Sequence, residues 1–227
     1  MFQLKNVSKS YKTKYADNLV LENININIPS TGITSITGSS GNGKSTLLNL
    51  ISGMDRPDTG TILYNDVDLG SLSKNKLADL RLNNFGFVFQ DFQLISTLTV
   101  KENIQVPERI KNKSNNNEWL EEILEMLELT EKRNRYAHQL SGGEKQRAAI
   151  ARAIITKPSV LLADEPTGNL DEDNTNRIMR FLFDYSKNNH CGLIFITHEL
   201  SLAQQAEHMI RIEKRSARFI QRGELTK

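Results

Sequence analysis

Long hydrophobic runs and cysteines are the scarcest features of this 227-residue sequence. Its longest unbroken apolar runs have four residues, for example Val160 to Ala163, whereas a helix that crosses a bilayer needs about 20. We therefore expect no transmembrane segment. The single cysteine, Cys191, excludes an intrachain disulfide and fits a reducing compartment. Because the first residues lack the pattern of a secretory signal, we expect the protein to work in the cytoplasm.

Excess charge of one sign is also missing. The 29 Lys and Arg residues nearly balance the 27 Asp and Glu residues, which leaves a formal charge of +2. This balance argues against a nucleic-acid binder held by bulk charge, and we expect no nucleic-acid partner. At 38% hydrophobic and 25% charged, the composition is that of a globular protein and excludes disorder as the dominant state. The length allows one large domain or a domain with an inserted subdomain.

Alternation and glycines organise the first quarter of the chain. Ile24, Ile26 and Ile28 are separated by polar residues, which is the period of a half-buried strand. A short β-rich segment at 33–37 then runs directly into glycines. The apolar spacing that follows predicts an amphipathic helix over 43–53. The predicted order is therefore strand, glycine-rich loop, helix.

Three later apolar segments, 85–89, 160–163 and 193–196, predict parallel strands that are covered on both faces. The stretch between the first two carries only helical patterns, which predicts a helical subdomain inserted in an α/β core. The predicted division of the single domain is a core of 1–90 and 158–227 with a helical subdomain of 91–157.

The glycines after the first buried strand form a phosphate-loop motif. Residues 38–45 match G-x-x-x-x-G-K-[ST] between a strand and a helix, and a plain flexible turn does not explain this context. Glycines let backbone N–H groups converge on phosphate oxygens, and the helix start adds its positive dipole end. Lys44 can reach the β- and γ-phosphates, and the Ser45 hydroxyl can ligate Mg²⁺. The candidate ATP-binding residues here are Gly38, Ser39, Ser40, Gly41, Asn42, Gly43, Lys44, Ser45 and Thr46.

Two adjacent carboxylates end the strand predicted at 160–163. Asp164 is placed to hold Mg²⁺ through its water shell, and Glu165 to polarise a water against the γ-phosphate. A solvated acidic turn followed by Pro166 is the alternative. The nearby phosphate loop favours the catalytic interpretation.

Four strand ends are expected to meet at one edge of the sheet. The strands predicted to end at Thr37, Phe89, Ala163 and Ile196 are followed by the phosphate loop, by Gln90, by Asp164-Glu165 and by Thr197-His198. In an open parallel sheet, ligands bind outside the carboxyl ends of the strands. We therefore predict a γ-phosphate contact for His198 rather than a plain surface imidazole. For Gln90 we predict a contact with Mg²⁺ or water rather than a simple polar strand terminator.

A third motif, Leu140-Ser141-Gly142-Gly143-Glu144, opens a predicted helix. Ser141 and Glu144 form an S-x-x-E capping box, and the helix is expected to run to about Thr156. Each glycine in a helix costs roughly 1 kcal/mol relative to alanine. The glycines at 142 and 143 would repay this cost by exposing N–H groups at a positive helix end. The chain therefore has two helix starts suited to phosphate.

Taken in order, these motifs resemble the ATPase subunit of ABC transporters across nearly the whole chain. Leu140 to Glu144 is close to diagnostic, and Asn169-Leu170-Asp171 also matches. The resemblance implies a P-loop NTPase core of α/β class with a mostly parallel sheet, an N-terminal antiparallel β subdomain and an inserted helical subdomain. The run 162–171 further resembles the branch of lipoprotein-release, macrolide-export, antimicrobial-peptide-resistance and cell-division ATPases.

The resemblance also implies a head-to-tail dimer that holds ATP between two subunits. Ser141, Gly142, Gly143 and Glu144 would contact ATP in trans, and Asp171 would lie at the dimer interface or cap a helix. Tyr11 matches the aromatic residue that stacks on adenine, although a packed aromatic is the alternative. Ser45, Gln90 and Asp164 would hold Mg²⁺, with Asp164 acting through water. Residues 91–103 correspond to the surface that accepts a membrane subunit.

The expected function is ATP hydrolysis that powers a separate integral membrane permease, with the protein peripheral on the inner face of the membrane. Glu165 would be the base, and Lys44, Gln90 and His198 would complete the catalytic set. Three alternatives stay open: a heterodimer instead of a homodimer, a soluble ABC ATPase for DNA processing or cell-division regulation, and a small-molecule kinase.

The carboxyl-terminal part is expected to close the fold with a hairpin from 209–212 and 218–221. Related chains usually have an Asp-Gly turn where this one has Lys214-Arg215-Ser216. Because Asp-Gly favours tight hairpins, we expect a longer or less regular connection here.

Overall fold

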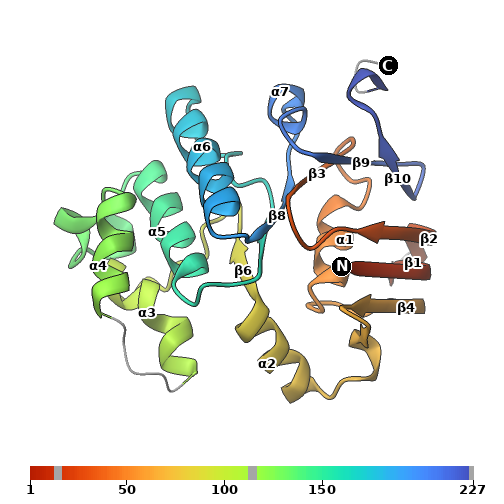
Figure 1. The fold of residues 1–227 in the computed structure, drawn as a ribbon, viewed down its shortest axis with the longest axis horizontal. Helices are drawn as coiled ribbons and strands as arrows, with labels where there is room; N and C mark the ends of the chain where they lie inside the picture. Colours follow the sequence, from red (N-terminus) through yellow and green to blue (C-terminus); the bar gives the residue numbers. More distant parts are fainter. Residues whose placement is uncertain (13–16, 112–116, 225–227) are drawn as a thin grey trace.

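The computed structural model describes residues 1–12, 17–111 and 117–224, and these residues form two sheets with helices around them (Figure 1). The first sheet is antiparallel, with the order β2-β1-β4-β5. Its strands are β1 (Phe2–Lys12), β2 (Asp17–Ile28), β4 (Thr59–Tyr64) and β5 (Val67–Asp68). The alternation predicted along β2 is present, since Ile24, Ile26 and Ile28 are buried while Asn25 and Asn27 are exposed.

The second sheet is mostly parallel and has the order β10-β9-β3-β8-β7-β6. Its strands are β3 (Ile33–Thr37), β6 (Phe85–Val88), β7 (Val160–Ala163), β8 (Gly192–Ile196), β9 (His208–Glu213) and β10 (Ser216–Ile220). All neighbours are parallel except β9 and β10. The three predicted apolar strands are therefore present, with β6 ending at Val88, one residue before the predicted end.

Seven α-helices occur in the described parts of the chain. They are α1 (Lys44–Ile51), α2 (Lys74–Asn84), α3 (Val100–Ile110), α4 (Asn117–Met126), α5 (Gly142–Ile154), α6 (Glu172–Asn188) and α7 (Leu200–Ala203), with short 3₁₀ turns at 69–71, 130–132, 137–139 and 222–224. Figure 1 shows α3, α4 and α5 gathered at one end of the molecule and β1, β2 and β4 at the other, with β6, β8 and α6 between them. None of the described helices is long and apolar enough to cross a membrane.

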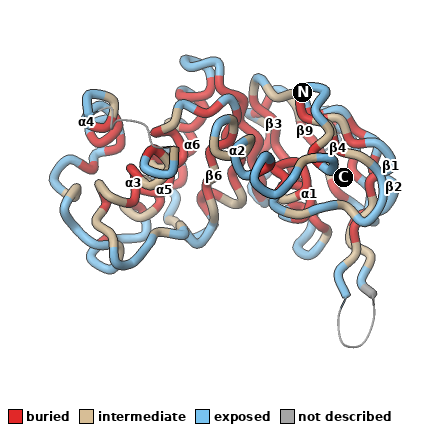
Figure 2. Tube along the Cα trace, turned by 90° about the horizontal axis from the view of Figure 1, so that it is seen from below, coloured by how far each residue is buried: buried red, intermediate tan, exposed pale blue. Residues whose placement is uncertain are grey.

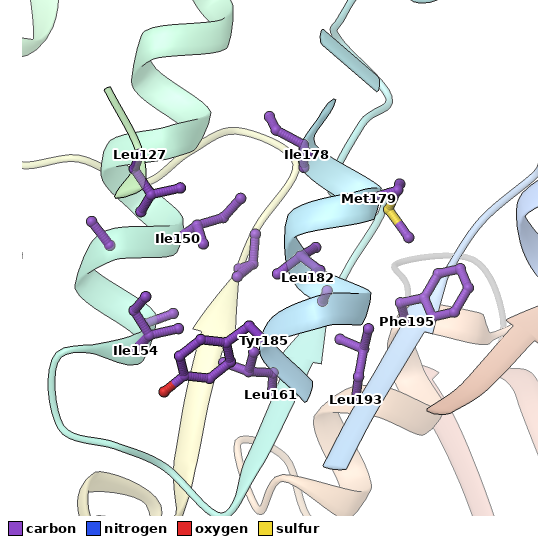
Figure 3. Close-up of a cluster of buried hydrophobic side chains, with 14 of the residues drawn as sticks. Leu127, Ile150, Ile154, Leu161, Ile178, Met179, Leu182, Tyr185, Leu193 and Phe195 are labelled. Carbon is purple, nitrogen blue, oxygen red and sulfur yellow. The ribbon is translucent and has the colours of Figure 1, made fainter. Parts of the chain in front are cut away.

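Two apolar clusters cover opposite faces of the parallel strands. On β7, Leu161 packs with helices α4 to α6, whereas Leu162 packs with α1 and the antiparallel sheet. On β8 the same alternation separates Leu193 from Ile194. Figure 3 shows Leu161 and Leu193 under the side chains of α5 and α6, and Figure 2 shows the buried trace through β3 and β6. Both faces are dry, which explains why these strands are continuously apolar in sequence.

The predicted closing hairpin is present, but the expectation of a long or irregular turn was wrong. Ser216 of β10 pairs with Glu213 of β9, so the turn contains only Lys214 and Arg215. Both have a left-handed backbone, with φ of 48° and 65°. Two such residues form the tight hairpin turn that usually favours Asn or Gly. The Arg215 carbonyl accepts a hydrogen bond from the backbone N–H of Glu22 at 2.9 Å, and this tertiary contact helps to hold the turn.

Candidate functional site

The phosphate loop lies between β3 and α1, and two of its glycines are required by space as well as by backbone angle. Gly38 has a φ of 147°, and a Cβ there would lie 2.4 Å from the carbonyl oxygen of Ile212. Gly43 has a φ of 93°, and its Cβ would lie 2.7 Å from Val20. Asn42 adds a side-chain hydrogen bond to the Ile212 carbonyl at 3.4 Å. The curl of the loop is therefore fixed against β9 and β2.

Lys44, the first residue of α1, turns its side chain back into this curl. Its Nζ donates to the carbonyl oxygens of Gly38 and Ser39, both at 3.0 Å. Burial lowers the pKa of Lys44, while the charges of Glu165 and Asp164 oppose that shift. The helix itself begins after Gly43 without a side-chain cap. A cation and an uncapped helix start thus converge on one loop, which suits an anion of several oxygens.

Ser45 and Asp164 meet across the edge of the sheet. The Ser45 hydroxyl donates to Asp164 Oδ1 at 3.1 Å, although 118 residues separate the two in sequence. Burial raises the pKa of the Asp164 carboxyl, and the nearby Glu165 charge adds to the shift, whereas the Ser45 hydrogen bond opposes it. A hydroxyl and a carboxylate in contact are hard oxygen donors of the kind that bind Mg²⁺. The residues present therefore fit this metal.

Glu165 and His198 form a pair at the ends of β7 and β8. Glu165 Oε1 lies 2.7 Å from His198 Nε2. The backbone of Glu165 is left-handed, with a φ of 45°, which is unusual for a residue with a side chain. Such strain gathers at functional sites, where surrounding structure holds it. The Glu165 side chain is 22% exposed and that of His198 45%, so both can reach a ligand from solvent.

Gln90 follows β6 and lies against the loop after Glu165. Its Nε2 is 3.0 Å from the position that a Cβ on Gly168 would occupy, and Glu165 Oε2 is 3.5 Å from the same point. Its backbone carbonyl accepts a hydrogen bond from Asn169 Nδ2 at 3.1 Å. Gln90, Glu165 and His198 therefore lie together, as the argument from strand ends predicts.

Sequence reasoning missed Arg152 on α5. Its guanidinium donates to the carbonyl oxygens of Phe92 and Gln93, at 2.9 and 2.5 Å. Both carbonyls belong to left-handed residues, with φ of 59° and 51°, in the loop that follows Gln90. Burial lowers the pKa of Arg152. The sequence gives no signal for this contact, because a helical arginine carries no information about which distant carbonyls it reaches.

The start of α5 is built differently from the start of α1. The predicted capping box is present, since Ser141 Oγ accepts from the Glu144 N–H and Glu144 Oε2 accepts from the Ser141 N–H. Glu144 also forms an ion pair with Lys132 at 2.8 Å, and these hydrogen bonds, that of Lys132 foremost, lower its pKa to about 2. Helix α5 ends at Ile154, two residues before the predicted end. Figure 1 shows α5 and α1 on opposite sides of β6 and β8, so the two glycine-rich helices do not lie next to each other within one copy of the chain.

The two glycines of this helix start have different surroundings. A Cβ on Gly143 would lie 2.7 Å from Asn174 Oδ1, whereas a Cβ on Gly142 would meet nothing closer than 3.7 Å. Asp171 caps α6 by accepting from the backbone and side-chain N–H groups of Asn174, both at 2.8 Å. Gly143 is thus explained by packing against α6. Gly142 has no such structural reason.

Tyr11 lies on β1 and is 39% exposed. Its hydroxyl donates to Asp55 Oδ2 at 2.9 Å. Asp55 in turn donates its backbone N–H to the carbonyl of Asn49 in α1 at 3.1 Å. The ring is therefore next to the helix that begins with Lys44 and Ser45.

An apolar cavity of about 480 Å³ opens beside the loop that follows Gln90. It lies between α2, β6, α3 and α5. Leu82, Phe87, Val106 and Pro107 supply apolar walls, and Arg152 reaches it from α5. Arg152 therefore both holds the loop after Gln90 and lines this cavity.

Comparison with known proteins gives consistent matches. A family model described as ABC transporter matches residues 21–168. The lipoprotein-releasing system ATP-binding protein LolD of Buchnera aphidicola subsp. Schizaphis graminum is 40% identical over 215 residues, covering 94% of each chain. The ABC transporter ATP-binding protein YxdL of Bacillus subtilis is 40% identical over 227 residues, covering 99% of this chain and 85% of YxdL.

The fold matches solved structures as well. The ATP-binding cassette MJ0796 of Methanocaldococcus jannaschii, solved as a dimer in a post-hydrolysis state bound to ADP and Pi, has a TM-score of 0.91 and 35% identity. The match covers 98% of this chain and 99% of that one. This likeness confirms the predicted fold class: an α/β ATPase core with an N-terminal antiparallel sheet and additional helices.

Proposed function

The chain belongs to the ABC transporter ATP-binding family, and from that membership we propose how its residues bind and hydrolyse ATP for a separate membrane permease. The observation that carries the proposal is the convergence of Lys44, Ser45-Asp164 and Glu165-His198 outside the carboxyl ends of β3, β7 and β8. Ligands of open parallel sheets bind in this position. The reaction is ATP and water to ADP and phosphate.

Lys44 binds the β- and γ-phosphates. Its Nζ already points into the curl of the loop, so binding exchanges the carbonyls of Gly38 and Ser39 for phosphate oxygens. Phosphate oxygens are charged acceptors, and charge-assisted hydrogen bonds are stronger than those to neutral carbonyls. The remaining loop residues, Ser39 to Gly43, and Thr46 offer backbone N–H groups to the same anion.

Mg²⁺ is the proposed cofactor, held by Ser45 and Gln90 and, through water, by Asp164. When bound, it neutralises charge on the β- and γ-phosphate oxygens. Burial that raises the pKa of Asp164 makes an ionised carboxylate unfavourable without a nearby cation. The Ser45-Asp164 contact is thus suited to a metal.

Glu165 accepts the proton of the attacking water, and His198 contacts the γ-phosphate. The hydrogen bond between them fixes the carboxylate at the end of β7. Gln90 lies close enough to orient the same water. A positioned general base of this kind accelerates hydrolysis by about 10² to 10⁴.

ATP joins two copies of the chain head to tail. Ser141, Gly142, Gly143 and Glu144 of one copy contact the nucleotide held by the phosphate loop of the other, and Asp171 lies at the interface. Gly142 supports this assignment, because its missing side chain has no packing reason. The solved relative MJ0796 is a dimer bound to ADP and Pi. A heterodimer with a related subunit uses the same contacts.

The membrane partner is a permease of an export, lipoprotein-release or antimicrobial-peptide-resistance system, and the chain works on the cytoplasmic face of the membrane. LolD carries the lipoprotein-releasing description, which supports this branch. We assign the permease contact to residues 91–103 and the adjoining apolar cavity. The DNA-processing alternative is not favoured, because the relatives compared are transporter subunits.

The test combines hydrolysis with assembly. Glu165→Gln should bind ATP with unchanged affinity, lose hydrolysis by about 10² or more, and accumulate a nucleotide-bound dimer in gel filtration. Asp184→Asn on α6 is a matched control at a carboxylate away from the strand ends. Normal hydrolysis by Glu165→Gln would remove Glu165 from the role of base. Co-purification of the wild type with an integral membrane protein tests the permease assignment separately.

A further inference from the structure

Lys9 and Asp55 form a partly buried ion pair that the proposed chemistry does not use. Lys9 is only 8% exposed, and its Nζ lies 2.9 Å from Asp55 Oδ1. The ammonium also donates to the Arg56 carbonyl at 2.8 Å and lies 3.8 Å from Asp58. Burial opposes the charge on Lys9, but the hydrogen bond and charge of Asp55 outweigh it and raise the pKa of Lys9. The pair is therefore fully charged at neutral pH.

Asp55 links two residues of β1 to helix α1, which follows the phosphate loop. Its Oδ1 accepts a hydrogen bond from the ammonium of Lys9 in β1. Its Oδ2 accepts one from the hydroxyl of Tyr11, two residues further along the same strand. Its backbone N–H donates to the carbonyl of Asn49 in α1 at 3.1 Å. Helix α1 begins with Lys44, so Asp55 fixes Tyr11 relative to the phosphate loop.

The contacts hold the Tyr11 ring at its hydroxyl and on the face that Lys9 covers, and they leave part of the residue exposed. The hydroxyl donates to Asp55, and Lys9 Nζ lies 5.1 Å from the ring centroid on one face. Tyr11 as a whole residue is nevertheless 39% exposed. A flat aromatic face that is held in place and open to solvent beside a phosphate site can stack on a nucleotide base.

We propose that Lys9 and Asp55 are positioning residues that hold Tyr11 as the platform for the nucleotide base. The inference rests on the proposed role of Tyr11 and deepens it. Without the anchor, the ring must be ordered when the base arrives, and ordering a side chain weakens binding. Because the Tyr11 hydroxyl is already hydrogen-bonded to Asp55, Tyr11 would contact the base through the face of its ring. It would not hydrogen-bond to the edge of the base.

The test separates the base from the phosphates. ADP and inorganic pyrophosphate both offer phosphates to Lys44, but only ADP carries a base. Tyr11→Phe removes the hydroxyl alone. The paired variant Lys9→Met/Asp55→Leu removes the anchor without leaving a buried charge unpaired. Both should lower the affinity for Mg-ADP by about three- to tenfold and keep the affinity for Mg-pyrophosphate within about twofold.

A double-mutant cycle on ADP affinity distinguishes a positioning role from a general effect on the fold. Only a positioning role makes the losses non-additive. Tyr11→Ala should weaken ADP binding by about tenfold. In the Tyr11→Ala background, Lys9→Met/Asp55→Leu should cause no further loss, because the residues act through the ring. Additive losses would overturn the proposal, as would equal losses for ADP and pyrophosphate.

The outcomes also distinguish this proposal from the one on which it rests. If Tyr11→Ala binds ADP like the wild type, Tyr11 is not the platform and both fail. If Tyr11→Ala weakens ADP binding but Tyr11→Phe and the paired variant do not, only the positioning role fails. Glu128→Gln, which removes an exposed ion pair with Arg177, is the control and should leave both affinities unchanged.

Discussion

The starts of α1 and α5 are both rich in glycine, yet they solve the problem of an exposed helix end in opposite ways. Helix α1 follows Gly43, whose backbone is left-handed, and it has no side-chain cap and no acidic residue in its first turn. Helix α5 begins with the Ser141 capping box, and Glu144 is further held by Lys132. One start is left open to an outside anion, while the other is stabilised by its own side chains.

The difference teaches what keeps each helix folded. Most of α1 is buried, with Leu47, Leu50 and Ile51 almost inaccessible, so packing can hold a helix whose start is uncapped. Helix α5 presents Ser141 and Gly142 to solvent. An exposed start without caps would fray, and the capping box prevents this. The exposed motif can therefore keep its shape before the contact in trans that we propose for it.

The largest effect expected from this comparison is at the open start. Lys44→Ala should lower the affinity for Mg-ADP by about a hundredfold or more, because it removes a buried cation from the phosphate loop. Lys145→Ala, at the start of α5, is the matched control and should leave ADP binding by the monomer unchanged. Equilibrium titration with ADP measures both, and an unchanged affinity for Lys44→Ala would contradict the phosphate assignment.

The two glycines of α5 should separate function from packing. Gly142→Ala has room for its methyl group and should raise the free energy of unfolding by up to about 1 kcal/mol, while ATP-dependent dimer formation and hydrolysis fall about tenfold. Gly143→Ala should destabilise the fold, because its Cβ would meet Asn174. Thermal unfolding and ATPase rates measured on both variants provide the check. Full activity of Gly142→Ala would leave that glycine without a role in trans.

The closed start should respond to pH. The pKa of Glu144 is lowered to about 2 from its usual 4.5, so its carboxylate contributes stability above pH 4.5 that is lost as the pH falls toward 2. Glu144→Gln keeps an acceptor for the capping box but loses the charge. It should cost roughly 1 to 2 kcal/mol at pH 7 and progressively less toward pH 3. Denaturant unfolding at several pH values measures the difference, and a cost independent of pH would contradict it.

The smallest effect is expected when the two serines are compared. Ser141→Ala should reduce the free energy of unfolding by about 1 kcal/mol through loss of the cap. Ser45→Ala should leave stability within about 0.5 kcal/mol but weaken the Mg²⁺ dependence of nucleotide binding, since Ser45 is exposed and its hydroxyl donates to Asp164. Equal stability losses would mean that the two helix starts are capped alike.

The sequence was sufficient for the fold class and for the residues that converge at the sheet edge. Both follow from local patterns: continuous apolar strands such as β7 and β8, and the rule that ligands lie beyond their carboxyl ends. The contacts of Arg152 and Asp55 could not be predicted in this way. They depend on left-handed loop carbonyls and on chain segments far apart in sequence, and neither leaves a periodic signal.

The turn at Lys214-Arg215 shows how tertiary contact overrides local preference. Residue type alone favoured a loose connection, since neither residue suits a positive φ. The hydrogen bond from Glu22 to the Arg215 carbonyl is absent from any local pattern. Lys214 and Arg215 therefore keep an unfavourable left-handed backbone, and the hydrogen bond from Glu22 links the two sheets at this turn.

That same hairpin touches the phosphate loop as well. The Ile212 carbonyl accepts a hydrogen bond from the Asn42 side chain and limits the space at Gly38. Three residues on, the Arg215 carbonyl accepts a hydrogen bond from the backbone N–H of Glu22 in the antiparallel sheet. The hairpin therefore supports both the phosphate loop and strand β2 of the antiparallel sheet. Damage there is expected to appear first as faster escape of bound nucleotide, before any general loss of the folded state.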